Sequence, residues 1–430
     1  MAGKSDSVAR KIAIVCAIEA VMIVCVLIGA LAPSVRNSIQ TAAATVSLMT
    51  DSWRAVAGLS PVEHLEPLRP DLSNDLAPDF SRMSRGVTFI VGLFDDRLTA
   101  RLVDEKGALI HEWPVDFFDL KDDKLYRFDA LIHGAHLYPN GDILITLEQK
   151  GLYRVDACGR VLWRNEDGPH HSIDVDDNGD IWTPLTVAEY AEPRLFGRPF
   201  GLDRIGRFDA ETGALVETID LVDVIINSGE EGLVAGEHSA SHDVLHVNDV
   251  EILDERFAAA FPMFSAGDIL VSARQRNAIF VIDRATRTIK WARTGATQLQ
   301  HDPDFGADGR ISIFDNRGSE PAGPGNGWLG HRGGSRIIAI RPGDFAFETL
   351  YQSRGDDIFY TPRRGKHERL ENGNLLIVET DAGRVFETTP SGDIVWQYVN
   401  RYDEANVGWV MSATRHAAEY AAIGSACGKP

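Results

Sequence analysis

The sequence is poor in positive charge and in the motifs of nucleotide-dependent enzymes. Its 43 Lys and Arg residues stand against 63 Asp and Glu residues, a formal net charge of −20. Nucleic acids and anionic lipid surfaces need a basic field, so neither is expected as a general partner. No Walker loop or Gly-x-Ser-x-Gly elbow occurs, and no Gly-x-Gly-x-x-Gly turn leads from a predicted strand into a helix. No cofactor is therefore expected.

Long amphipathic helices are also missing from about Val87 until the end of the chain. Short β-rich runs alternate there with Asn-Gly, Asp-Gly and Gly-Asp turns, and a chain of 430 residues with 44% hydrophobic content can bury a large core. One kind of run, a turn followed by an aliphatic and aromatic strand, recurs at intervals of about 45 to 75 residues. Its copies are residues 107–113, 159–165, 213–219, 287–293, 345–351 and 392–398.

Each copy is typical of the outer strand of a four-stranded propeller blade, so the pattern predicts an all-β, six-bladed β-propeller over residues 86–417. A β-sandwich is the alternative, but a sandwich does not require a fixed turn-plus-aromatic repeat. The first unit begins one strand short, and residues 407–416 are expected to supply that strand and close the ring. Residues 418–430 are then a C-terminal tail. A Gly-rich run at 320–334 is expected as a loop over the channel mouth.

The N-terminus carries the longest apolar run. Residues 12–32 contain a single charge over 21 positions, which is the length of a helix that crosses a bilayer. Basic residues precede this run, so the N-terminus is expected in the cytoplasm and the rest of the chain outside it. Residues 1–33 form the predicted membrane anchor and residues 34–85 a juxtamembrane helix and linker. A cleaved signal peptide is the alternative.

Two features of the anchor and the cysteines bear on partners. Glu19 lies inside the apolar run, where a carboxylate is costly; it marks either a contact with a membrane partner or a protonated or snorkelling residue near one leaflet. Cys158 and Cys427 would share an oxidising compartment and are able to pair, although their spacing does not establish it.

Three histidines share one spacing. His133, His171 and His301 each precede the glycine of a predicted turn by eight residues. The innermost strands of a propeller all run the same way along the axis, so equal offsets place these side chains at one level of the channel. His246 begins the corresponding strand of the fourth unit, and His367 is displaced from the common offset by two residues.

Arg274 and Asn248 are expected to lie at the same rim as these histidines. A lone histidine in a blade is usually structural. Several histidines buried with an arginine and an amide are costly unless they bind something. The imidazoles alone would suit a metal ion, but a fixed guanidinium would repel it, so no metal is expected there and an oxyanion fits best.

The order of four short motifs resembles the arylsulfotransferase family, which are six-bladed propellers of the bacterial periplasm. The motifs are His-x-Asn (246–248), Ser-x-Arg (272–274), Gln-His-Asp (300–302) and Phe-Asp-Asn (314–316), and residues 170–182 and 370–398 extend the likeness. The resemblance implies a periplasmic enzyme that moves a sulfuryl group from an aryl sulfate to a phenol through a sulfated histidine, without a nucleotide donor. The predicted span at residues 12–32 would anchor this enzyme in the membrane.

Carried over by motif, the nucleophile is His301, while His246, Asn248 and Arg274 hold the sulfuryl oxygens. His171, or its neighbour His170, completes the site. His133 and His367 are expected as further lining residues. Asp302 is a candidate to orient His301. The N-terminal β-sandwich of well-known family members has no room in this chain.

Two other classes remain open on the sequence. A non-catalytic propeller could bind or scaffold a membrane complex, and copurification with another membrane subunit would favour it. A metal-dependent propeller hydrolase would be favoured by a stoichiometric metal ion in the purified protein.

Overall fold

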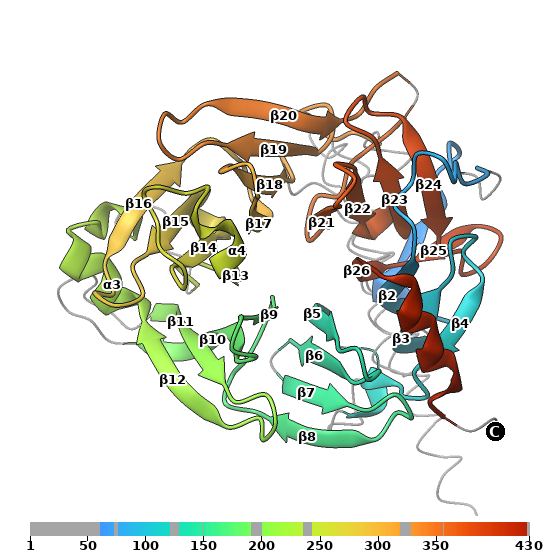
Figure 1. Cartoon of the computed structure of the whole chain (residues 1–430), viewed down its shortest axis with the longest axis horizontal. Helices are drawn as coiled ribbons and strands as arrows, with labels where there is room; N and C mark the ends of the chain where they lie inside the picture. Colours follow the sequence, from blue (N-terminus) through green and yellow to red (C-terminus); the bar gives the residue numbers. More distant parts are fainter. Residues whose placement is uncertain are drawn as a thin grey trace, which may run out of the picture. The chain divides into compact units, whose positions relative to one another are not determined.

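Six four-stranded antiparallel sheets surround a central axis (Figure 1). This computed structural model describes residues 61–427 apart from 73–75, 121–127, 129, 149, 191–199, 235–242, 319–327 and 356. The predicted six-bladed, all-β propeller is confirmed. The predicted membrane span at residues 12–32 lies outside the described residues; among those described, no helix is long and apolar enough to cross a membrane.

The blades follow one another along the chain, with the innermost strand first in five of them. Blade 2 comprises β5 (Ile132–Leu137), β6 (Ile143–Leu147), β7 (Gly151–Val155) and β8 (Val161–Asn165). Blade 3 comprises β9 (Asp174–Val175), β10 (Ile181–Tyr190), β11 (Phe200–Phe208) and β12 (Leu215–Asp220). Blade 4 comprises β13 (Val247–Ile252), β14 (Ile269–Ala273), β15 (Ala278–Ile282) and β16 (Ile289–Thr294).

Blades 5 and 6 repeat the same order. Blade 5 comprises β17 (His301–Phe305), β18 (Ile311–Asp315), β19 (Arg336–Ile340) and β20 (Phe347–Gln352). Blade 6 comprises β21 (Lys366–Arg369), β22 (Leu375–Glu379), β23 (Arg384–Thr388) and β24 (Ile394–Val399). The six runs predicted as outer strands are the outer strands of the six blades, and short helices α3 (Leu221–Ser228) and α4 (Glu255–Ala258) lie in the connections.

Local turn chemistry explains the regular spacing of the strands. In the turn between β7 and β8, Asp156 Oδ1 accepts hydrogen bonds from the backbone N–H groups of Cys158 and Arg160, each at 2.9 Å. Gly159 in that turn has φ +79°, a conformation that favours glycine. Asp104 with Gly107 and Asp209 with Gly213 form the same kind of turn in blades 1 and 3. In blades 4 and 5 the residue with positive φ is Arg287 or Phe345, and in blade 6 Thr389 replaces the aspartate.

The first blade is closed by the end of the chain, as predicted. β26 (Val410–His416) pairs antiparallel with β2 (Val87–Phe94), with Val87 opposite His416, and β3 (Arg97–Val103) and β4 (Leu109–Glu112) complete the sheet. β26 is therefore the innermost strand of blade 1 (Figure 1).

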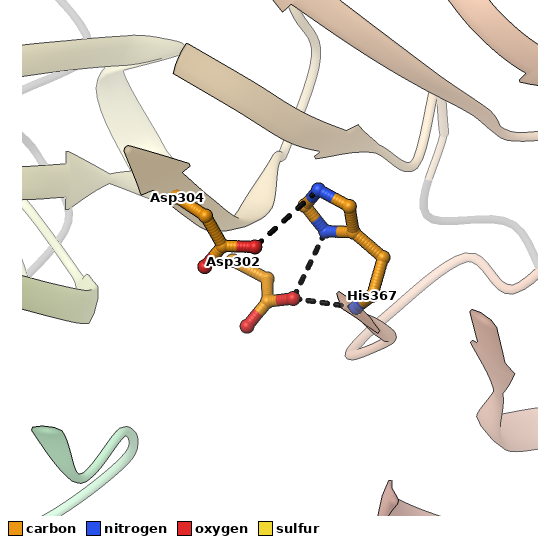
Figure 2. A group of neighbouring side chains, drawn as sticks. All are labelled: Asp302, Asp304 and His367. Atoms are coloured by element: carbon orange, nitrogen blue, oxygen red, sulfur yellow. Dashed lines mark hydrogen bonds and ion pairs between the residues drawn. The ribbon is translucent and has the colours of Figure 1, made fainter. Parts of the chain in front are cut away.

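Inner strands of adjacent blades bring their side chains together at the axis. Figure 2 shows this for blades 5 and 6, where His367 on β21 points toward Asp302 and Asp304 on β17. The apolar side chains lie instead between the sheets, for example Phe305, Ile311 and Ile338 in a cluster shared by blades 4 and 5.

Part of the segment predicted as a linker is packed on the propeller. β1 (Leu65–Pro67) pairs antiparallel with β25 (Asn406–Gly408), and both carboxylate oxygens of Glu379 lie within hydrogen-bonding distance of the Arg69 guanidinium. The Arg69 and Glu379 side chains are 3% and 0% exposed. Removal of one partner from a buried ion pair destabilises a protein, because the other charge stays buried without compensation. Residues 65–69 therefore belong to the folded unit.

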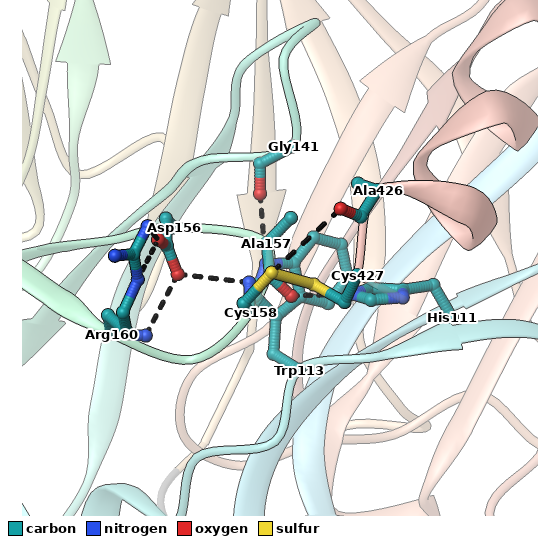
Figure 3. Close-up of a disulfide and its surroundings, with 9 residues drawn as sticks. All are labelled: His111, Trp113, Gly141, Asp156, Ala157, Cys158, Arg160, Ala426 and Cys427. Carbon is teal, nitrogen blue, oxygen red and sulfur yellow. Dashed lines mark hydrogen bonds and ion pairs between the residues drawn. A yellow bond between two sulfur atoms is a disulfide. The ribbon is translucent and has the colours of Figure 1, made fainter. Parts of the chain in front are cut away.

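The predicted tail ends in a covalent link to blade 2. After the 3-10 helix η9 (Ala418–Ser425), Cys427 forms a disulfide with Cys158, with 5.5 Å between the Cα atoms and 269 residues between the two positions (Figure 3). The pairing left open by the sequence is thus present in the structure.

Loss of this disulfide is expected to destabilise the protein without changing its fold. A cross-link over a long loop restricts the unfolded chain, and its removal should lower the free energy of unfolding by about 2 to 5 kcal/mol. The measurement is thermal unfolding of wild type and Cys427→Ser. Wild type in reductant should match the variant, which in turn should not respond to reductant; equal unfolding temperatures under oxidising conditions would contradict the expectation.

Candidate active site

A pocket at the axis gathers side chains from five blades and from the loops before β9 and β21. It includes about 300 Å³ of space, part of it open to solvent. Its lining residues are His133, His171, Asn248, Asp249, His301, Arg364, Gly365, Lys366 and Met411. Of the histidines with the common offset, all three meet here.

His301, the first residue of β17, is held in one tautomer by its neighbours. Its Nδ1 lies 2.7 Å from Asn316 Oδ1. The amide nitrogen of Asn316 donates to the carbonyls of Thr361 at 2.8 Å and Arg364 at 2.7 Å, which fixes the amide with its oxygen toward the imidazole. Nδ1 of His301 therefore carries the proton, and Nε2 keeps its lone pair.

The environment of His301 also keeps the ring neutral. Burial, and next to it the positive charge of Arg274, lower the pKa of His301 well below its usual range. The backbone N–H of Arg364 donates to Nε2 at 3.2 Å. Nε2 is thus an unprotonated nitrogen in the pocket at neutral pH, which is the form that acts as a nucleophile.

His133, His171 and His246 form a row of rings beside it. The ring centroids are 4.3 Å apart for His133 and His171 and 5.0 Å apart for His171 and His246. His133 Nε2 lies 3.2 Å from Glu148, and burial lowers the pKa values of His133 and His171. His133 and His171 are therefore neutral bases in addition to His301.

His170 and Gly134 position His171 from behind. His170 Nδ1 lies 2.5 Å from His171 Nδ1, and His170 Nε2 lies 3.2 Å from Asp203. A Cβ at Gly134 would lie 2.4 Å from the carbonyl oxygen of His171, so only glycine lets β5 pass this close. His170 therefore contacts His171 without lining the pocket, whereas the His171 side chain lines it.

His246 is paired with an acid that the sequence analysis did not single out. Its Nδ1 lies 2.5 Å from Asp243 Oδ2, and its backbone N–H donates to Asp243 Oδ1 at 3.0 Å. His246 and His171 have φ values of +52° and +59°, in the left-handed region that non-glycine residues rarely adopt. Such conformations cluster at functional sites, and here they aim two adjacent imidazoles at the axis.

Arginines supply positive charge around His301. Pairing of β13 with β14 places Val247 opposite Ala273, so Arg274 returns to the level of His246, and its backbone N–H donates to the His246 carbonyl at 3.1 Å. Burial lowers the pKa of Arg274, and Arg363 and Arg364 add to this effect. Among the described residues, no acid forms an ion pair with the Arg274 guanidinium.

Asn248 has spare hydrogen-bonding capacity. Its Nδ2 donates to the Gln300 carbonyl at 2.8 Å, which leaves a second N–H, while its Oδ1 is buried without a partner in the part of the chain that the structure describes. A buried amide oxygen without a donor is costly, so a ligand with a hydroxyl group would stabilise it.

Three predicted residues, His170, His246 and Arg274, lie next to the lining residues rather than among them. Two further predicted residues lie elsewhere. His367 does not line the pocket and is instead buried against Asp302 and Asp304. Asp302 contacts Lys366 and His367 rather than His301, so its suggested role as the orienting residue is wrong, and Asn316 has that role.

Lys366, Asp249 and Arg364 were missed as lining residues. Lys366 Nζ lies 2.7 Å from Asp302 and 3.4 Å from Asp249, and burial raises the pKa of Asp249. Arg364 and Lys366 belong to a basic run at residues 363–366 of an acidic chain, and this run could have indicated them as site residues. Asp249 follows Asn248 directly and carried no signal of its own.

Comparison with known proteins assigns the family. The sequence model described as Arylsulfotransferase (ASST) matches residues 134–401, well over half of the chain. The protein therefore belongs to the arylsulfotransferase family. No curated protein matches it.

Many solved structures are similar at low identity. A protein of unknown function from Bacteroides caccae has 12% identity and a TM-score of 0.48, with 76% of this chain and 98% of that chain covered. Virginiamycin B lyase from Staphylococcus aureus has 12% identity and a TM-score of 0.36, with coverage of 62% and 69%. Hydrazine synthase from Kuenenia stuttgartiensis has 11% identity and a TM-score of 0.41, with coverage of 68% and 71%.

Proposed function

We propose that the protein transfers a sulfuryl group from an aryl sulfate to a phenolic acceptor through a covalent sulfo-histidine at His301. The observation that carries the proposal is the fixed tautomer of His301, because Asn316 holds the Nδ1 proton and leaves Nε2 as the pocket's nucleophile. The arginines and His246 around it supply the other two requirements, charge for the sulfuryl oxygens and a proton carrier.

The first half-reaction forms the intermediate. The Nε2 lone pair attacks sulfur, the bond between sulfur and the ester oxygen breaks, and its electron pair leaves with the phenolate. Arg274, and the second N–H of Asn248, face the negative charge on the sulfuryl oxygens. The Arg364 N–H that donates to Nε2 at 3.2 Å in the free protein loses that acceptor and turns to a sulfuryl oxygen.

His246 is the proton carrier in this scheme. It gives a proton to the departing phenolate, and Asp243 at 2.5 Å stabilises the imidazolium form. In the second half-reaction the acceptor hydroxyl returns a proton to His246 as its oxygen attacks sulfur. The N–S bond then breaks and its electron pair returns to Nε2 of His301.

An assay of the purified full-length chain tests the reaction class. A chromogenic aryl sulfate is supplied with and without a phenol, at varied concentrations of both. A covalent intermediate predicts parallel lines in double-reciprocal plots and release of one equivalent of phenolate without an acceptor. Intersecting lines would contradict the intermediate, and no turnover of any aryl sulfate would contradict the proposed function.

We further propose that residues 12–32 anchor the chain in the bacterial inner membrane, with the propeller in the periplasm. The apolar run, its basic flank and the disulfide between Cys158 and Cys427 support this location. Glu19 is then available to contact a membrane partner. Mass analysis of the mature protein tests the anchor, since an N-terminus at Pro33 would contradict it.

Two substitutions of Arg274 should distinguish the effect of its positive charge from the effect of its planar guanidinium. Arg274→Lys keeps the charge but loses the planar fork, so kcat should fall by about 10²-fold while the pH profile keeps its midpoint. Arg274→Gln also removes a charge that lowers the pKa of His301, so that pKa rises. Because the neutral ring is the active form, the acid limb of the rate should then move to higher pH.

The two pH profiles check this expectation. The wild-type rate should not decline near pH 6.5, the ordinary pKa of histidine, because the ring remains neutral at lower pH. Two results would show that Arg274 does not lower the pKa of His301. One is a wild-type rate that falls at acid pH with a midpoint near pH 6.5, and the other is an equal midpoint of this fall in Arg274→Lys and Arg274→Gln.

A further inference from the structure

Blades 5 and 6 bring two carboxylates and an imidazole together outside the lining of the histidine pocket (Figure 2). Asp302 and Asp304 lie on β17 and His367 on β21, and each offers a ligand atom within 4.8 Å of the other two. The proposed transfer reaction uses none of these three side chains.

Hydrogen bonds from Asp302 decide the tautomer of His367. Asp302 Oδ2 accepts from the backbone N–H of His367 at 2.5 Å and lies 3.0 Å from its Nδ1, and Lys366 Nζ lies 2.7 Å from Oδ1. An ionised carboxylate only accepts, so Nδ1 carries the proton. In the neutral ring, Nε2 then presents a lone pair.

That lone pair faces another acceptor. His367 Nε2 lies 3.4 Å from Asp304 Oδ2, its side chain is 0% exposed, and it has no hydrogen-bond partner among the residues described. The Asp304 side chain is 31% exposed. A buried imidazole nitrogen without a donor is unfavourable unless a positive species lies between it and the carboxylate.

The spacing matches a metal ion. Zn–N and Zn–O bonds of about 2.0 to 2.1 Å at a tetrahedral angle place the two ligand atoms about 3.3 Å apart. A metal-binding histidine also commonly donates its other ring N–H to a carboxylate, as His367 does to Asp302. Both oxygens of Asp302 are engaged, so Asp302 orients His367 and is not itself a ligand.

We propose that His367 Nε2 and Asp304 bind a divalent transition-metal ion of the zinc class between blades 5 and 6. A mixed nitrogen and oxygen donor set favours such an ion over calcium or magnesium. Glu251 is the neighbouring carboxylate, since its Oε2 accepts from the backbone N–H of Phe305 at 2.7 Å, and water completes the coordination.

The surrounding charge permits the ion. Lys366 is the nearest cation, but it lies on the far oxygen of Asp302 and is shared with Asp249. Glu251 interacts electrostatically with Asp304 and Asp249, so three acidic side chains lie near the proposed ion. The ion links blade 5 to blade 6 and does not contact His301, so its role is structural. The expectation that the histidine pocket holds no metal concerns a different site.

Zinc titration of chelator-treated protein tests the site. Calorimetry should show one tight Zn²⁺ ion per chain, and Zn²⁺ should raise the unfolding temperature because it binds only the folded state. Co²⁺ in place of Zn²⁺ should give a visible spectrum of nitrogen and oxygen coordination. Asp304→Asn and His367→Gln should remove the tight site, and Asp302→Asn should weaken it by about 10- to 100-fold.

Two further variants locate the ion. His331→Gln changes an exposed histidine and should leave binding unchanged. His246→Gln should also leave it unchanged; loss of binding there, with binding kept in Asp304→Asn, would place the ion in the histidine pocket and overturn the proposal. Failure of wild type to bind Zn²⁺ would overturn it too, and would assign a proton to the space between His367 and Asp304. Circular dichroism of each variant separates lost binding from lost folding.

Discussion

His301→Ala is expected to abolish sulfuryl transfer, with a loss on the order of 10⁴-fold or more, the scale seen when a covalent nucleophile is removed. Nε2 of His301 has its lone pair in the pocket because Asn316 holds Nδ1, and no other atom would accept sulfur in the proposed scheme. Wild type incubated with aryl sulfate alone should gain one sulfuryl mass on the peptide that contains His301. The variant should gain none. The adduct must be isolated at mild pH because an N-sulfo bond is acid-labile.

Two controls give this result its meaning. Asn316→Ala leaves the imidazole in place but frees its tautomer, so transfer should fall while the adduct still forms at His301. His136→Ala changes a histidine of β5 that does not line the pocket and should leave transfer unchanged. A sulfuryl mass on His171 or His246 would make the assignment to His301 wrong while keeping the pocket. Transfer that persists in His301→Ala would exclude covalent catalysis at this residue.

The blades were predictable because their signal is local. A side chain that accepts a hydrogen bond within its own turn and a residue with positive φ recur before each outer strand, as at Asp156 and Gly159. These features depend on a few adjacent residues, so a single sequence displays them. Closure by β26 was predictable for a related reason, since a propeller with one blade short of a strand must obtain it from the other end of the chain.

The pocket was predictable only where it follows strand register. Equal offsets placed His133, His171 and His301 together, and the pairing of β13 with β14 placed Arg274 beside His246. Partners that reach the site across blades followed no such rule. Asn316 holds His301 through contacts with Thr361 and Arg364, on the loop before the next blade.

Asp302 shows how a strand position misleads. It follows His301 directly, which suggested that it orients that ring. Its own φ of +54° turns the backbone, and its carboxylate goes to Lys366 and His367 of the adjacent blade. Alternation along an ideal strand does not apply at a residue in the left-handed region, and the sequence alone does not reveal where such residues lie.

Removal of β26 is expected to unfold the propeller. A chain that ends at residue 405 lacks the innermost strand of blade 1, which exposes the backbone of β2 and the apolar side chains Ile90 and Phe94 that pack with Val410 and Ala413. It also opens the ring between blades 6 and 2. A folded protein is typically stabilised by only about 5 to 15 kcal/mol. The free energy lost with all contacts of a buried strand is expected to exceed this value. Circular dichroism and unfolding cooperativity are the measurements.

Two longer chains isolate the effect of the strand. A chain that ends at residue 416 keeps β26 but loses η9 and Cys427, so it should fold with the lower stability of the disulfide variant. A chain that ends at residue 427 should behave as wild type. The order of stability is therefore expected to be 427, then 416, with no cooperative unfolding for 405. A 405 chain that unfolds as cooperatively as the 416 chain would show that five complete blades hold the fold without closure, and that β26 serves the pocket through Met411 rather than the ring.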